Sequence, residues 1–249
     1  MPSELEYTQE VAAGARGARA RRVQEWLTLH GLGVVPDGKF GPATAAAVRA
    51  FQKRQRLRET GVVNRATFEQ LVAPARRALA PIAPKAGTTL GALTVAYARQ
   101  HLAEHPREVG GANRGPWVRL YMDGNEGDEW LWCAGFATYV LRQAAETLGQ
   151  PLPVARTFSC DELAGSARKK QCFCAGNKKG TAPMPITPGS LFLSRHAPDD
   201  WNHVGIVADA GPDVIVTIEG NTNDSGDREG FEVCERLRNY KNKDFITIA

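Results

Sequence analysis

The sequence predicts an α+β protein with two domains, a small helical one and a larger one in which helices precede a small antiparallel sheet. Three observations indicate this. Apolar residues recur every three or four positions in several segments between residues 20 and 150, which is the period of a helix. Two runs rich in β-branched residues follow at 202–209 and 213–219, as expected for a hairpin. Between the helical groups, residues 74–89 hold prolines among alanines, which is typical of a semi-rigid linker.

Residues 20–73 are expected to form three helices. The first ends at Gly31, because glycine readily adopts the left-handed conformation that follows a helix. Pro42 opens the second, since proline is tolerated in a first turn. Asn64 can cap the third, which covers residues 65–71.

This helical segment also carries an ordered pattern of turn and helix residues. The pattern is Asp37-Gly38-x-Phe40-Gly41-x-x-Thr44, then Ala47-Val48-x-x-Phe51-Gln52. It resembles the peptidoglycan-binding domain type 1 family. The resemblance implies binding to bacterial peptidoglycan, with Asp37, Phe40 and Thr44 as candidate substrate-binding residues. Each position also has a purely structural interpretation, because glycines make turns and apolar residues face the core.

The flanking segments complete the predicted organisation. Residues 1–19 are an N-terminal extension, and residues 90–249 form the second domain. Residues 1–85 hold 14 Lys and Arg against 7 Asp and Glu, which leaves 17 against 20 in the rest. The basic part should favour an anionic partner, although a solvated basic face explains it equally. No nucleic-acid partner is expected, because no nucleic-acid-binding motif accompanies these charges.

Cys133 is the candidate nucleophile of the second domain. It directly precedes an amphipathic stretch that ends at Gly149, so it should lie at a helix N-terminus. Free backbone amides and the helix dipole stabilise a thiolate there, and the amide of Cys133 can serve an oxyanion hole. Cys160, Cys172 and Cys174 lack the paired spacing of common zinc sites, and five cysteines are too few for a disulfide scaffold.

The two β-rich runs supply a base and a residue to orient it. A three-residue loop at 210–212 would pair residue 209 with 213 and place His203 directly opposite Glu219. Opposite Cβ atoms lie about 5 Å apart, so the carboxylate can hold the imidazole. Asn221 shares this face if the strand continues. A slip of one residue would destroy the arrangement.

These residues resemble the CHAP family, within the papain-like group that includes the NlpC/P60 peptidases. The signatures are Trp132-Cys133-Ala134-x-Phe136, Pro188-Gly189-Ser190-Leu191-Phe192, Asn202-His203-Val204-Gly205-Ile206-Val207 and Glu219-Gly220-Asn221-Thr222-Asn223. The resemblance implies a papain-like domain with Cys133 as nucleophile, His203 as general base and acid, Glu219 as its orienter and Asn221 as an auxiliary residue. It adds Arg114, Trp132 and Asn202 as candidate substrate-binding residues.

No cofactor is required by this chemistry, but some CHAP domains bind calcium shortly before the cysteine. Asp123, Asn125 and Asp128 occupy that stretch and offer the oxygen ligands that calcium requires. A solvated acidic loop is the alternative. We assign no role to the insertion at 156–187.

The sequence as a whole predicts a cysteine-dependent peptidoglycan amidase or endopeptidase. The alternatives are a wall-binding adaptor with an inert papain-like module and a cysteine protease or deamidase that acts on proteins. The N-terminus lacks the features of a secretory signal, and no apolar run reaches the roughly 18 residues of a membrane helix. We therefore expect synthesis in the cytoplasm without a signal peptide and no membrane span. Release to the wall would depend on phage holins, for an endolysin, or on a secretion system, for an antibacterial effector with an immunity protein as a further partner.

Overall fold

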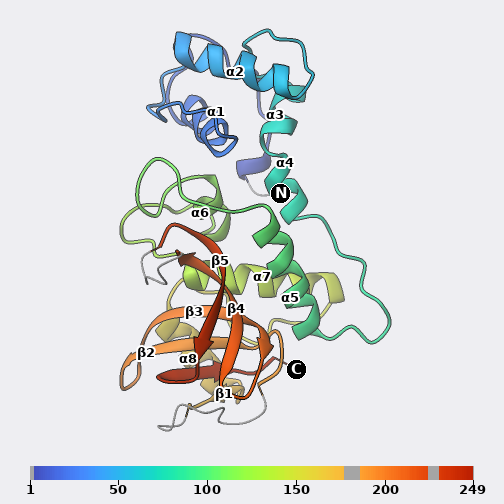
Figure 1. The fold of residues 1–249 in the computed structure, drawn as a ribbon, viewed down its shortest axis with the longest axis vertical. Coiled ribbons are helices and arrows are strands. Elements are labelled where there is room, and N and C mark those ends of the chain that lie inside the picture. The colour runs from blue at the N-terminus through green and yellow to red at the C-terminus, as the bar shows by residue number, and fades with distance from the viewer. Residues whose placement is uncertain (1–2, 177–185, 224–229, 249) are drawn as a thin grey trace. The chain divides into compact units, whose positions relative to one another are not determined.

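The computed structural model describes residues 3–176, 186–223 and 230–248. It combines an N-terminal helical domain with an antiparallel sheet toward the C-terminus (Figure 1), which confirms the predicted α+β class. The chain divides into two compact units. The first is Met1–Arg77 with Arg107–Asp128, and the second is Ala78–Pro106 with Glu129–Ala249.

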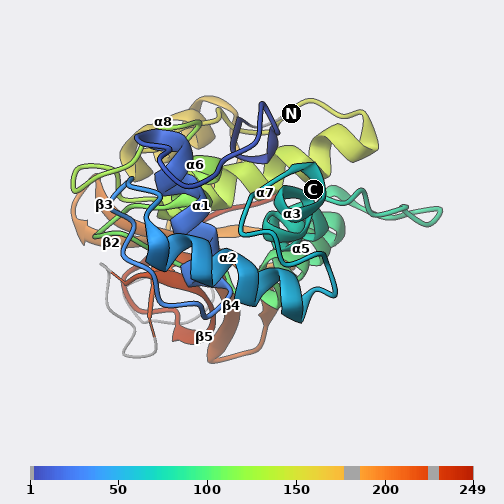
Figure 2. The same ribbon diagram turned by 90° about the horizontal axis from the view of Figure 1, so that it is seen from above.

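Short helices build the first unit. They are η1 (Ser3–Leu5), α1 (Ala18–Leu29), α2 (Pro42–Arg54), α3 (Arg65–Leu71), α4 (Ala73–Ala78, which ends at the boundary of the unit) and α6 (Pro116–Tyr121). Figure 2 shows α2 in front of α1, against which it packs. The side chain of Asn64 accepts a hydrogen bond of 2.9 Å from the backbone amide of Thr67. This confirms the predicted cap of the third helix.

A buried glutamine in α1 ties this helix to the loop and helix that follow it. The Gln24 amide group donates to Asp37 (2.8 Å) and to the hydroxyl of Thr44 (3.1 Å), while its oxygen accepts from the backbone amide of Gly38 (2.8 Å). Both polar atoms of this side chain therefore have hydrogen-bond partners inside the protein, as burial requires. Asp37 and Thr44 consequently belong to the framework of the domain.

A second glutamine repeats the same device one helix later. Gln52 of α2 donates to the hydroxyl of Thr67 in α3 (3.0 Å) and accepts from the backbone amide of Gly61 (2.9 Å). The two halves of the helical domain thus share one construction, in which a helix glutamine holds the next loop glycine and the next helix threonine. The motif residues Gly38 and Thr44 are explained by this repeat.

The first unit also contains two segments that the sequence placed elsewhere. The segment expected to be an extension, 1–19, is tied into this unit by isolated bridges from Val11 to Val63 and from Arg16 to Lys39. Residues 107–128, expected in the second domain, belong here, and the Trp117 ring of α6 packs edge-on against Trp26 at 5.9 Å. The sequence pattern predicts no helix at 116–121 and does not indicate which domain buries this segment. The observed units therefore differ from the predicted boundaries 20–73 and 90–249.

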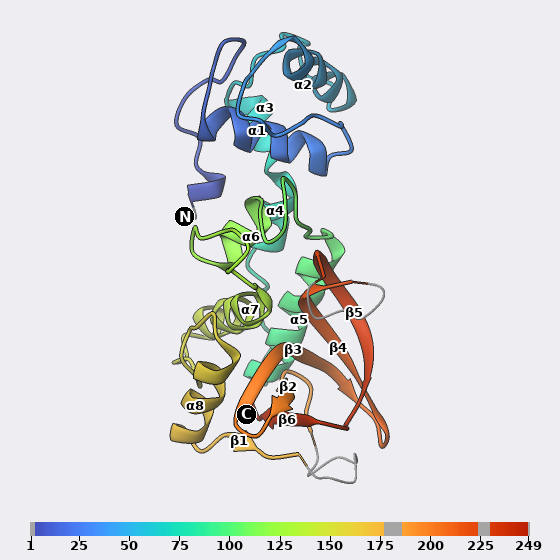
Figure 3. The same cartoon turned by 90° about the vertical axis from the view of Figure 1, so that its left-hand side faces the viewer.

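The second unit places helices against a six-stranded sheet. The helices are α5 (Leu90–Ala103), α7 (Cys133–Leu148) and α8 (Cys160–Lys169), and the strands are β1 (Phe173–Cys174), β2 (Leu191–Ala197), β3 (Asp200–Ala210), β4 (Val214–Thr222), β5 (Glu232–Asn239) and β6 (Lys243–Ile246). The sheet order is β1-β6-β2-β3-β4-β5, and all its described pairs are antiparallel. Figure 3 shows α7 and α8 beside the strands, where α7 packs on β3 and β4 and α8 packs on β3. Across the described ranges, no helix is long and apolar enough to cross a membrane.

We expect Gln24→Ala to destabilise the first unit by about 2 kcal/mol, because the Gly38 amide and the Thr44 hydroxyl lose a buried partner. A urea titration measures the free energy of unfolding, and hydrogen exchange of α1 peptides follows this unit by itself. Gln70→Ala is the matched control, since Gln70 is an exposed residue of α3. Equal losses in both variants would show that the buried amide is dispensable.

Candidate functional site

Cys133 is the first residue of α7, as the sequence predicts. Trp132 precedes it at the cap position without a side-chain cap, and the helix ends at Gly149 in the left-handed conformation, φ 64°. The first backbone amides of a helix have no acceptor within it, and together with the helix dipole they favour a negative charge on the sulfur. Cys133 itself is 4% exposed.

The hairpin that carries the candidate base does not have the predicted register. Next to the loop, Asp209 pairs with Val216 and not with residue 213 as predicted. The pairing then shifts by one residue between Val207 and Asp209, so that Val207 pairs with Thr217. Near the site the pairing is therefore displaced by two residues from the prediction, whereas at the loop it is displaced by three. Side chains alternate between faces along a strand, so only the even displacement keeps His203 and Glu219 on one face.

A glycine makes the diagonal contact between these two residues possible. Continuing the observed register by one pair sets Gly205 opposite Glu219. A Cβ atom at Gly205 would lie 2.6 Å from Cγ of Glu219, which is far too close, so the missing side chain leaves the space that the glutamate occupies. Through this space Glu219 reaches His203, whose Nε2 lies 2.7 Å from Oε2 of the carboxylate. The predicted contact is present although the predicted pairing is wrong.

A second glycine brings β4 close to the start of α7. A Cβ atom at Gly220 would lie 2.7 Å from Cβ of Phe136 and 2.8 Å from the Trp132 ring. The strand that carries Glu219 can therefore lie directly against the helix terminus that carries Cys133. Trp132 is fully buried in this contact, so it supports the fold, and its predicted contact with substrate is not supported.

Arg238 is a residue of the site that the sequence did not indicate. From β5 it donates two hydrogen bonds to the Glu219 carboxylate, Nε to Oε1 at 2.9 Å and Nη2 to Oε2 at 2.7 Å. The Thr217 hydroxyl donates a third, at 2.5 Å. Such a two-pronged contact fixes the plane of the carboxylate. No local motif surrounds Arg238, and only the high proportion of charged residues along 235–238 suggests an outer strand.

The pKa values of Glu219 and His203 are displaced in opposite directions. Burial raises the pKa of the Glu219 carboxyl, but the hydrogen bonds from Arg238 and His203 outweigh it and lower that pKa to about 2. Burial lowers the pKa of His203, but its interactions with Cys133 and Glu219 raise it to about 9. Glu219 is therefore ionised and His203 protonated at neutral pH.

The Cys133 thiol complements this charge. Its interaction with Cys160 lowers its pKa, burial raises it, and the neighbouring His203 lowers it again, so the pKa lies well below its usual value. The Nδ1 atom of His203 has no hydrogen-bond partner among the residues described, and it is the ring nitrogen left to exchange a proton with the thiol. The arrangement can hold a thiolate beside an imidazolium, which is the activated form of a cysteine nucleophile.

Asn221 differs from its predicted position on a regular strand. The pairing of β4 with β5 is irregular between Glu219 and Thr222, and Asn221 has a φ of 56°. The two-residue alternation on which its placement depended is therefore interrupted. Its amide is buried, and neither amide atom has a partner within the described part of the chain. A buried amide of this kind is uncommon, and the auxiliary role of Asn221 stays a prediction.

The remaining predicted binding residues differ in burial and in the unit to which they belong. Phe40 and Thr44 are each 2% exposed, so they are core residues and not a contact surface. Arg114 belongs to the first unit, and Asn202 is half-buried on β3. Asp37 is exposed and lines a cavity of the first unit.

The predicted calcium ligands Asp123, Asn125 and Asp128 also belong to the first unit and not to the unit of Cys133. The amide nitrogen of Asn125 donates to the Met122 carbonyl. Within the described ranges, no three His, Cys, Asp or Glu side chains converge on a place that could hold a metal ion. The calcium site stays a prediction.

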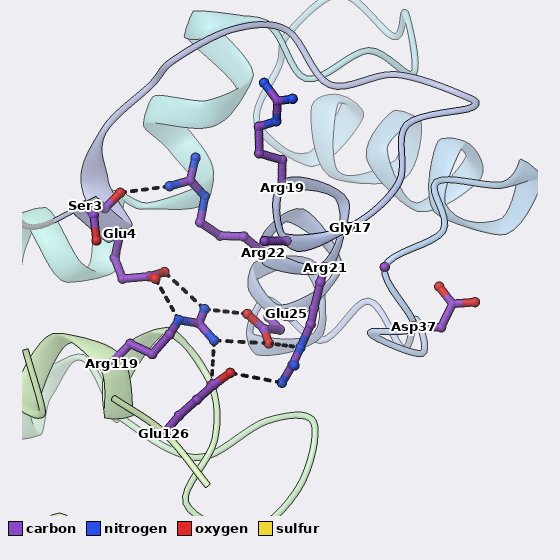
Figure 4. Close-up of a pocket in the computed structure, with 12 residues that line it drawn as sticks. Ser3, Glu4, Gly17, Arg19, Arg21, Arg22, Glu25, Asp37, Arg119 and Glu126 are labelled. Carbon is purple, nitrogen blue, oxygen red and sulfur yellow. Dashed lines mark hydrogen bonds and ion pairs between the residues drawn. The ribbon is translucent and has the colours of Figure 1, made fainter. Parts of the chain in front are cut away.

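The cavity of the first unit has a volume of about 490 Å³. Figure 4 shows the Arg119 guanidinium of α6 pointing between three carboxylates, Glu4 (2.7 Å), Glu25 (2.6 Å) and Glu126 (2.7 Å). Burial lowers the pKa of Arg119, but the hydrogen bonds that it donates to Glu4 and Glu25 raise it above its usual value. This network joins η1, α1 and α6.

The lining of the cavity also includes charged side chains beside the start of α1, which has no side-chain cap. Arg19 and Asp37 line the cavity, and Gly17 precedes the helix. Arg19 is exposed, so its guanidinium can meet an anionic group of a polymer. The cavity is the candidate ligand surface of this unit.

We expect Cys133 to react with iodoacetamide at a pH well below the roughly 8.5 of an ordinary thiol, because the thiolate exists beside the imidazolium. Mass mapping of the Cys133 peptide across a pH series measures the midpoint. His203→Ala should move this midpoint upward, since it removes the cation. His105→Ala is the control, because the His105 ring contacts Glu232 instead (2.6 Å). A midpoint near 8.5 in the original chain contradicts the thiolate.

Comparison with known proteins bears on the first unit. No curated protein matches the chain. The resemblance of the second unit to the CHAP family stays a prediction, but residues 16–71 match the family model described as a putative peptidoglycan binding domain. The resemblance found in the N-terminal motifs is thus confirmed for this segment, and it supports association with the cell wall and peptidoglycan as a partner.

Proposed function

We propose that the chain is a cysteine-dependent peptidoglycan hydrolase that cleaves an amide bond of the bacterial cell wall. The observation that carries the proposal is the buried set of Cys133, His203 and Glu219, in which the pKa of the thiol is lowered and that of the imidazole is raised to about 9. The peptidoglycan-binding segment at 16–71 supports the substrate. A wall-binding domain would concentrate a hydrolase on this polymer.

The proposed reaction proceeds through a thioester. The Cys133 thiolate attacks the amide carbonyl carbon, and backbone amides at the start of α7 stabilise the resulting oxyanion. The His203 imidazolium then donates its proton to the leaving amine as the carbon–nitrogen bond breaks. In the second half His203 removes a proton from water, which attacks the thioester and releases the thiolate. Glu219 keeps the imidazole ring in place throughout.

The chemistry accommodates two kinds of bond. In an N-acetylmuramoyl-L-alanine amidase the carbonyl belongs to the lactyl group of the sugar, and in an endopeptidase it belongs to the stem peptide or cross-bridge. Both present an amide to the thiolate, so the mechanism is the same. Either activity would serve lysis or the killing of competing bacteria, with release by holins or by a secretion system as the proposed route.

We expect Cys133→Ser to lower hydrolysis of purified sacculi on the order of 10³-fold or more, because a serine hydroxyl does not ionise near neutral pH as the thiol does. The release of new amino groups measures the rate, and the masses of the products identify the bond. Cys172→Ser and Cys174→Ser are controls, since burial raises the pKa of both thiols above the usual value.

Cys160 and Cys234 are not suitable controls, because the first contacts Cys133 and the second pairs with Glu219. Hydrolysis that survives in a folded Cys133→Ser protein would refute the mechanism. Binding to sacculi without release of amino groups by the original chain would favour the inert adaptor. Cleavage of a protein substrate in place of the wall would favour the protease.

We expect Arg19→Glu to weaken binding of the full chain to sacculi about fivefold, since a surface charge contact contributes roughly 1 kcal/mol. A pull-down of the chain with sacculi measures binding, and the loss of hydrolysis should be greater on sacculi than on soluble muropeptides. Arg58→Glu is the matched control, because Arg58 is exposed in the same unit and does not line the cavity. Equal losses in both variants would indicate unspecific charge attraction and not a site at the cavity.

A further inference from the structure

A second cysteine lies beside the candidate nucleophile. The sulfur atoms of Cys133 and Cys160 are 3.9 Å apart. Both residues are reduced and buried, with Cys160 8% exposed. Each is the first residue of its helix, Cys133 of α7 and Cys160 of α8. The hydrolytic reaction described above does not use Cys160.

We propose that Cys133 and Cys160 form an oxidation site for small hydroperoxides, in which Cys160 is the resolving cysteine that captures oxidised Cys133 as a disulfide. Only one part of this proposal rests on the proposed function, namely that oxidation causes a reversible loss of hydrolysis. The disulfide itself requires the two sulfur atoms and an oxidant.

The chemistry of the site balances in two steps. The Cys133 thiolate attacks the terminal oxygen of the hydroperoxide, so a sulfur–oxygen bond forms and the oxygen–oxygen bond breaks, and the His203 imidazolium gives its proton to the departing oxygen. The products are a sulfenic acid and an alcohol, or water from hydrogen peroxide. The Cys160 thiol then attacks the sulfenic sulfur. A sulfur–sulfur bond forms, and hydroxide leaves and takes the proton of that thiol as water. Two thiols have lost two electrons in total to the peroxide, and a dithiol can return them.

The geometry favours this pair over other cysteines. A disulfide has a sulfur–sulfur distance of about 2.0 Å, so the two atoms must approach by roughly 2 Å, which is within the reach of side-chain rotation. Cys172 and Cys174 are in less favourable surroundings, because their sulfur atoms contact backbone carbonyls of Ala167 and Ala175. Capture by Cys160 is therefore the short path for an oxidised Cys133.

The distance also decides between two fates of the sulfenic acid. Without a nearby thiol, further peroxide converts it to a sulfinic acid, which dithiols do not reduce. A thiol already in contact competes with that second oxidation. Cys160 would thus protect the nucleophile by trapping it in a form that can be recovered.

The test treats the reduced full chain with limiting hydrogen peroxide and follows intact mass, peptide mapping and hydrolysis of sacculi. We expect the original chain to lose two hydrogen atoms, to yield a Cys133–Cys160 linked peptide, and to regain its free thiols with dithiothreitol. Cys160→Ser should instead gain one or two oxygen atoms at Cys133. Its recovery of Cys133 thiol should be about tenfold lower. Cys172→Ser is the matched control and should behave as the original chain.

Several results would overturn the proposal. They are a linked peptide that joins Cys133 to another cysteine, oxidation of Cys133 in the original chain without any link, or equal recovery in Cys160→Ser. If Cys160→Ser does not fold, Cys160→Ala and the peptide map of the original chain still test whether Cys160 captures oxidised Cys133. The link is measured by mass, so a chain that forms it but does not hydrolyse sacculi would sink the proposed function and leave the oxidation site intact.

Discussion

The second unit depends on one buried carboxylate, that of Glu219. A charge removed from water is tolerated only where it is paired and hydrogen-bonded. Here β3 supplies His203, β5 supplies Arg238, and β4 itself supplies Thr217. The contact that joins these three strands is therefore also the contact that keeps His203 protonated and, through it, favours the thiolate of Cys133. Folding of the sheet and preparation of the site cannot be separated.

The features that could be predicted from the sequence have local causes. The cap at Asn64 and the helix end at Gly149 depend on neighbouring residues alone. The shared face of His203 and Glu219 could be predicted because it depends only on an even or odd offset. The register itself could not, since the irregularity after Val207 that sets it leaves no mark in the pattern of β-branched residues.

The features that could not be predicted depend on contacts between distant segments. Arg238 and Cys160 lie beside the site only because strands and helices bring them there, and no motif surrounds either. The opposite error concerns Phe40, Thr44 and Trp132, which belong to family-like motifs but are buried. A motif combines residues that maintain a fold with residues that touch a ligand, and the sequence alone does not separate the two.

Gly205 shows that the geometry of such a site also depends on a residue that has no reactive group. The position contributes no atom to any proton transfer, yet a side chain there would collide with Glu219 and with the Phe192 ring, each 2.6 Å from a Cβ. A related chain that retained the cysteine, histidine and glutamate but carried alanine at this position would match every reactive residue and still displace the carboxylate. The absence of a side chain at this position is thus a criterion for recognising which sequences of this kind can hold the carboxylate in place.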